Sequence, residues 1–154
     1  MIVIPVVLSS LYLAGFTIYE NIISETKGPV HWHADYQVWV CGERNMLVEP
    51  EGIGNKIGAS TLHEHNDGRI HIEGTLLKIE DASLGKYFAA IGGELENDHL
   101  VYKIDKGVLD VKNHDKCNGK ESNLKVYVNG KRITNFEDYL IYPSSYVPPG
   151  DCII

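Results

Sequence analysis

The chain has 154 residues, of which 14 are basic and 21 acidic, and its formal net charge is −7. This length allows one small globular domain and little more. The acidic balance argues against a nucleic-acid partner, because binding to phosphate depends on basic surface. It is compatible with cations near the protein surface.

The first segment is strongly apolar. Residues 1–19 carry no charged side chain, and Glu20 is the only charge before Glu25. About 20 apolar residues are enough to cross a bilayer as a helix. We therefore expect residues 1–23 to form a transmembrane anchor, residues 24–29 a linker, and residues 30–154 a β domain.

Two other interpretations of the first segment stay open. A cleaved signal peptide would begin with basic residues and end at a small-residue cleavage site. No Lys or Arg precedes Lys27, and Ser24 and Gly28 offer only a poor site. A buried helix of a soluble domain is the other interpretation, but this segment is apolar on every side, which is unusual in so small a domain.

The side of the membrane is not fixed by flanking charge, because the positive-inside rule has almost no basic residues to count here. The three Cys and seven His of the chain favour an oxidising, metal-accessible compartment. We therefore expect a cell-membrane protein with a single span and its domain on the extracytoplasmic side. Other membrane-protein subunits are expected partners.

The remaining chain predicts a mostly β fold. From residue 30 to residue 40 apolar and polar residues alternate with the period of a strand, with His31 and His33 on the polar face. Further along, the patterns predict a hairpin, a helix and several short strands. These lie at 61–65 and 69–73 (hairpin), 76–79, 81–93 (helix, capped by Asp81 or Ser83), 99–104, 108–112, 124–129, 135–140 (helical turn) and 151–154 after Pro148 and Pro149, with a polar loop at 113–123. The expected fold is a small antiparallel sheet, sandwich or barrel-like domain with one short helix.

Five histidines fall in three short clusters. They are His31, His33, His63, His65 and His71. In a strand, residues two apart share a face, so each His-x-His places two imidazoles side by side. If residues 66–68 form a three-residue turn, His63 lies directly opposite His71, with Cβ atoms about 4.5–5.5 Å apart. A two-residue turn would move His71 to the other face.

If the strand of His31 and His33 lies beside this hairpin, the imidazoles converge on one site. Imidazole without sulfur, in an oxidising compartment, favours a copper or zinc ion. Asp35 and Glu73 share the histidine face and are expected to orient imidazole N–H groups. Glu64 should point to the opposite face. The isolated His99 and His114 are expected on the surface.

The cysteine count is odd. Cys41, Cys117 and Cys152 allow one disulfide and one free thiol outside the cytoplasm. A bond between Cys117 and Cys152 is preferred over one between Cys41 and Cys152. The chain has no Cys-x-x-Cys motif, which argues against thiol exchange and c-type haem attachment.

Four runs of sequence carry a resemblance to a family. They are VHWHADYQVWVCGE, LHEHNDGRIHIEG, LKVYVNGK and YVPPGDCII. Together they resemble a poorly characterised family of small membrane-anchored, His-rich extracytoplasmic proteins of archaea, especially ammonia-oxidising archaea. The resemblance covers nearly all of residues 29–154. It implies a copper-rich setting and an accessory subunit of a membrane copper complex such as ammonia monooxygenase, but no catalytic residues.

The leading hypothesis is a membrane-anchored protein that binds copper or zinc and is not catalytic by itself. One alternative is a structural subunit of a membrane or filament assembly without a catalytic metal. Another is a small metalloenzyme with Glu64 or Glu73 as its base.

Overall fold

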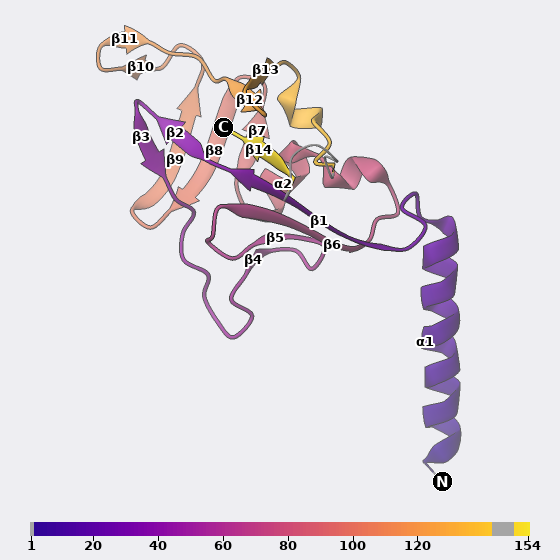
Figure 1. Cartoon of the computed structure of the whole chain (residues 1–154). Coiled ribbons are helices and arrows are strands. Elements are labelled where there is room, and N and C mark those ends of the chain that lie inside the picture. The colour runs from indigo at the N-terminus through magenta and orange to yellow at the C-terminus, as the bar shows by residue number, and fades with distance from the viewer. Residues whose placement is uncertain (1, 143–149) are drawn as a thin grey trace.

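The computed structural model describes residues 2–142 and 150–154. Its helix α1 (Val3–Ile23) stands apart from a β domain (Figure 1). Its mean hydropathy is 1.5, and none of its residues is buried. A helix that satisfies its own backbone and is apolar all round suits lipid. α1 is therefore long and apolar enough to cross a membrane, and the expected combination of an apolar helix with a mostly β domain is confirmed.

One large sheet organises the described part of the domain. Its seven strands have the order β13-β12-β14-β1-β6-β5-β4. They span Pro29–Tyr36 (β1), Ile57–Gly58 (β4), Leu62–Glu64 (β5), Arg69–Thr75 (β6), Val126–Val128 (β12), Lys131–Ile133 (β13) and Asp151–Ile153 (β14). Because β1 and β6 are adjacent near its centre, segments far apart in sequence share one face.

Smaller elements surround this sheet. They are the hairpin β2 (Val38–Val40) and β3 (Glu43–Asn45), the sheet of β7 (Glu94–Glu96), β8 (His99–Ile104) and β9 (Gly107–Lys112), the hairpin β10 (Lys116–Cys117) and β11 (Lys120–Glu121), the 3-10 turns η1 (Ile79–Ala82) and η2 (Phe136–Asp138), and the helix α2 (Leu84–Ala90).

The large sheet is mixed, whereas the sequence predicted an antiparallel one. β14 runs parallel to β1, with Ala34 opposite Asp151. Parallel neighbours need a long connection, and here almost the whole domain lies between the two strands. The strand predicted at residues 30–40 is divided at Gln37: Pro29–Tyr36 forms β1 in the large sheet, and Val38–Val40 forms β2 in a separate hairpin.

Several shorter elements differ from the sequence prediction. Residues 76–79 form no strand, and the helix is limited to Leu84–Ala90, with Ser83 as its N-cap. The loop predicted at 113–123 contains the hairpin β10–β11, and β7 was not predicted. Pro148 and Pro149 lie outside the described residues.

The core lies on one face of β1, β6 and β5. Ala34, Ile70 and Ile72 have no exposed surface, and α2 adds Tyr87 and Phe88 to the same buried cluster. Since strand side chains alternate between faces, the opposite face of these three strands is left to the polar residues between the buried ones. That face carries the histidines.

The segment between α1 and β1 is packed against the domain. Ser24 is fully buried, and the carboxylate of Glu25 accepts a hydrogen bond from the Ile79 N–H at 2.7 Å. Thr75, the last residue of β6, donates to the Asn21 side chain at 3.0 Å. The end of α1 is therefore joined to the end of β6, close to the strands that bear histidines.

The disulfide prediction is wrong. Cys117 is bonded to Cys41, with Cα atoms 5.3 Å apart, and Cys152 is an exposed free thiol. Cys152 lies in the large sheet, whereas Cys117 lies in the separate hairpin β10–β11. That hairpin approaches the end of β2, where Cys41 lies, so only tertiary packing decides the pairing.

Breaking this bond should destabilise the domain. Cys41→Ser is expected to lower the free energy of unfolding by about 2–4 kcal/mol, because the bond restricts the unfolded chain over a sequence separation of 76 residues. Urea unfolding under oxidising conditions measures the change. Cys152→Ser is the control and should leave stability unchanged. A larger loss of stability in Cys152→Ser than in Cys41→Ser would show that Cys152 forms the disulfide.

Gly150 should be indispensable where β14 meets β1. Its φ is +147°, and a Cβ there would lie 1.8 Å from the carbonyl oxygen of His33. Gly150→Ala should therefore push β14 away from β1 and lower stability by more than about 3 kcal/mol. At Gly54 a Cβ meets only a Lys56 carbon at 3.9 Å, so Gly54→Ala is the matched control. Equal urea midpoints for the two variants would contradict this close contact.

Candidate metal centre

Three adjacent strands bring the histidines to one face. His33 on β1 pairs with His71 on β6, and His71 pairs on its other side with His63 on β5. His71 is thus the middle of a row of three imidazoles that crosses the sheet. His31 and His65 lie next to this row, each two residues from a member of it.

The hairpin between β5 and β6 sets this register. The pairing of His63 with His71 leaves a three-residue turn at residues 66–68, as predicted. Asn66 and Gly68 adopt positive φ angles of 61° and 73°, which asparagine and glycine tolerate best. A turn of any other length would shift His71 relative to His63.

Glu64 holds the turn from inside the protein. Its side chain lies on the core face, as predicted, and the residue is 1% exposed. Its two carboxylate oxygens accept hydrogen bonds from the backbone N–H groups of Asn66 at 2.5 Å and Gly68 at 2.8 Å. Burial raises the pKa of this carboxyl group, and the two N–H donors oppose that rise. The sequence pattern predicted the face of the strand on which Glu64 lies but not its hydrogen bonds to the turn.

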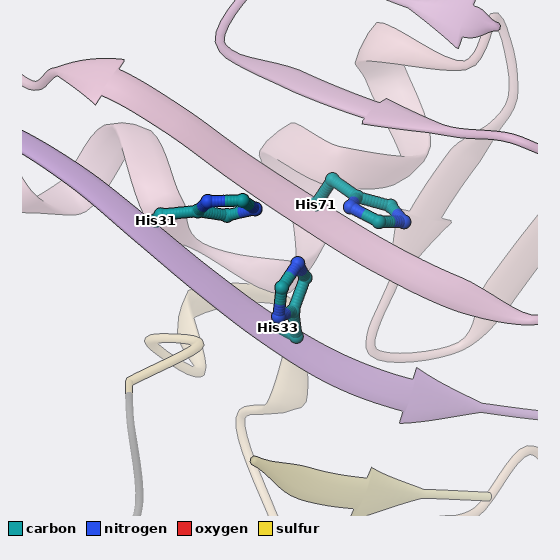
Figure 2. A group of neighbouring side chains, drawn as sticks. All are labelled: His31, His33 and His71. Carbon is teal, nitrogen blue, oxygen red and sulfur yellow. The ribbon is translucent and has the colours of Figure 1, made fainter. Parts of the chain in front are cut away.

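The five rings are close enough to share metal ions. Ring centroids are 4.6 Å apart for His31 and His33, 4.7 Å for His33 and His71, and 4.9 Å for His65 and His71. Figure 2 shows the rings of His31 and His33 directed from β1 toward β6, with one ring nitrogen of His71 on their side. Two groups have ligand atoms that all lie within 4.8 Å of one another: His31, His33 and His71, and His63, His65 and His71.

Two ring nitrogens in this cluster are buried without a hydrogen-bond partner among the described residues. They are His63 Nδ1 and His71 Nε2. Buried polar atoms are normally paired, so such atoms need an explanation. A metal ion bound to these nitrogens would supply the missing partner.

The protonation state also suits a metal. Burial lowers the pKa of His63 and His71, and the neighbouring His33 lowers that of His71 further. Burial and then His31 lower the pKa of His33. These rings are therefore neutral near pH 7, with lone pairs free for a cation.

His65 is fixed in a useful tautomer. Its Nδ1 contacts the backbone carbonyl oxygen of Asn55. A carbonyl oxygen only accepts, so Nδ1 is the donor, and in the neutral ring Nε2 has the lone pair. This is the usual way in which the outer partner of a metal-binding histidine selects the ligating nitrogen.

Of the two carboxylates expected to orient imidazoles, only Glu73 lies beside them. Glu73 lies on the histidine face, with carboxylate oxygens 3.1 Å from His31 Nε2 and 3.9 Å from His63 Nε2. Within the part of the chain that the structure describes, Asp35 contacts no histidine side chain at hydrogen-bonding distance. It accepts instead from Arg69 Nε at 2.7 Å and Arg69 Nη2 at 3.4 Å. Arg69 lies directly opposite Asp35 in the β1–β6 register, so the expected contact between Asp35 and an imidazole is replaced by an ion pair.

The two remaining histidines lie elsewhere. His114 is exposed and contacts Glu121. His99 belongs to a group with Glu94 and Glu96 that the sequence analysis missed, because β7 was not predicted. His99 is already paired with Asp110 at 2.8 Å, and both glutamates are exposed.

No family model, no curated protein and no solved structure matches this chain. The chain combines an apolar helix of membrane-spanning length with a β domain whose histidine groups can hold a metal ion.

Removing the carboxylate of Glu64 should loosen the turn that aligns the histidines. Glu64→Ala leaves two N–H groups without their acceptor and is expected to lower the free energy of unfolding by about 1–3 kcal/mol. Glu64→Gln retains an acceptor oxygen and should lose less. Urea unfolding of both variants checks this; an unaltered midpoint for Glu64→Ala would show that the turn holds without the carboxylate.

Proposed function

We propose that this protein is a membrane-anchored metal-binding protein that holds copper or zinc through the histidines of β1, β5 and β6. The observation that carries the proposal is the position of His71. It lies between histidines on both sides, and its buried Nε2 has no hydrogen-bond partner in the described chain.

The donor set favours copper(II) or zinc. Both groups around His71 contain only imidazole nitrogens. Cys41 and Cys117 are bonded to each other, and Cys152 belongs to neither group. A site without thiolate or thioether lacks the soft ligands that copper(I) prefers, whereas imidazole suits copper(II) and zinc.

The disulfide supports an extracytoplasmic position. Disulfides persist mainly in oxidising compartments, and the Cys41–Cys117 bond supports placing the domain there. The hydrogen bond between the end of α1 and the end of β6 supports a histidine face near the membrane surface.

The site suits capture and transfer of an ion. Its side chains range from the buried His63, 3% exposed, to His31, 64% exposed. An ion bound at the exposed end is accessible to a partner. Together with the family resemblance of the sequence, this supports an accessory subunit that supplies or holds metal for a membrane copper complex such as ammonia monooxygenase.

Metal titration tests the binding site. The full chain in detergent, stripped with a chelator, should bind copper(II) and zinc. His71→Ala should weaken binding by more than about 100-fold, because loss of even an outer partner commonly weakens binding about 10–100-fold. His114→Ala is the matched control, since His114 is an exposed histidine outside both groups. Equal affinities for the two variants would contradict the site.

The partner is tested separately in native membranes. Crosslinking followed by purification of the tagged chain should recover subunits of a copper-containing membrane complex. Recovery of the chain alone, with its metal, would reject the accessory-subunit role and leave metal binding intact.

A further inference from the structure

The cluster contains more imidazoles than one ion needs. Copper and zinc in such sites commonly take four ligands, and exchangeable sites leave one position to water. Here five histidines form two groups of three, and the two groups have only His71 in common. One group joins β1 to β6, and the other joins β5 to β6.

The two nitrogens of His71 point in different directions. Figure 2 shows one of them directed toward His31 and His33 and the other directed away from both. Nε2 lies 3.6 Å from the carboxylate of Asp67, which belongs to the turn that follows His65. Nε2 is therefore the nitrogen on the hairpin side, and Nδ1 is the one directed toward β1.

We propose that His71 bridges two metal ions. One ion is held by His31, His33 and His71 Nδ1, and the other by His63, His65 and His71 Nε2. This inference rests on the proposed metal-binding function and adds a second ion to it. With metal–nitrogen bonds of about 2 Å on either side of one imidazole ring, the two ions would lie about 6 Å apart.

Protons and charge balance in this arrangement. A neutral imidazole has one lone pair and one N–H, so the second ion replaces that proton, which leaves to solvent. His71 is then an imidazolate with a charge of −1. Glu73, which contacts His31 and approaches His63, and Asp67, which approaches His71, add negative charge beside both ions.

The two positions differ in access. The hairpin-side group includes His63, which is buried, whereas the β1-side group includes His31, which is exposed. The ion of the hairpin-side group, called the inner ion, is therefore shielded from solvent. The ion of the β1-side group, called the outer ion, is open to exchange. We expect the outer ion to be removed first by a competing chelator.

Copper content and electron paramagnetic resonance test the bridge. The full chain in detergent, loaded with copper(II) and desalted, should contain two copper ions per chain. Coupling through the imidazolate should make the integrated spin signal much smaller than the copper content. His31→Ala and His65→Ala should each retain one ion with its full signal, and His114→Ala should behave like the unaltered chain.

The outcomes separate this inference from the proposed function. One copper ion per chain, or two with the full spin signal, would overturn the bridge and leave metal binding in place. No bound copper or zinc would overturn both. Two coupled ions that become one uncoupled ion in His31→Ala would establish the bridge.

Discussion

The pairing of β6 with both of its neighbours is the constraint on which the site depends. His71 is central only because β1 and β5 each place a histidine directly opposite it. On the β5 side this pairing is set by three turn residues, and the buried carboxylate of Glu64 holds two of their N–H groups. A charged group in the core is unfavourable by itself. Here the Glu64 carboxylate fixes the turn that aligns His63 with His71 on the opposite face of the sheet.

The histidine face combines buried imidazoles with unpaired ring nitrogens. Burial favours neutral imidazoles, but it also leaves His63 Nδ1 and His71 Nε2 without hydrogen bonds in the described chain. Unpaired buried nitrogens destabilise a fold. A bound metal would relieve that penalty, and stabilisation by the ion would rise with its concentration. The ion pair between Asp35 and Arg69 does not depend on metal, and it joins β1 to β6 two residues from His33 and His71.

The apolar helix α1 and the histidine face are connected through the end of β6. Thr75 at the end of β6 contacts Asn21 in α1, and Glu25 contacts η1. The strand that carries His71 therefore ends beside the last turn of α1, the helix that is long and apolar enough to cross a membrane. Such a connection limits how far the histidine face can move relative to α1.

Local patterns in the sequence were enough to predict the apolar helix and the turn at residues 66–68. They also predicted the alternation that puts His31 and His33 on one face of their strand and Ala34 and Tyr36 on the other. Each depends on neighbours a few residues apart, whose periodicity and turn preferences are set by local backbone sterics. Tertiary structure alone decided the parallel pairing of β14, the Cys41–Cys117 bond and the engagement of Asp35 by Arg69. These depend on which distant segments pack together, and that choice is made by the burial of the shared core rather than by any local pattern.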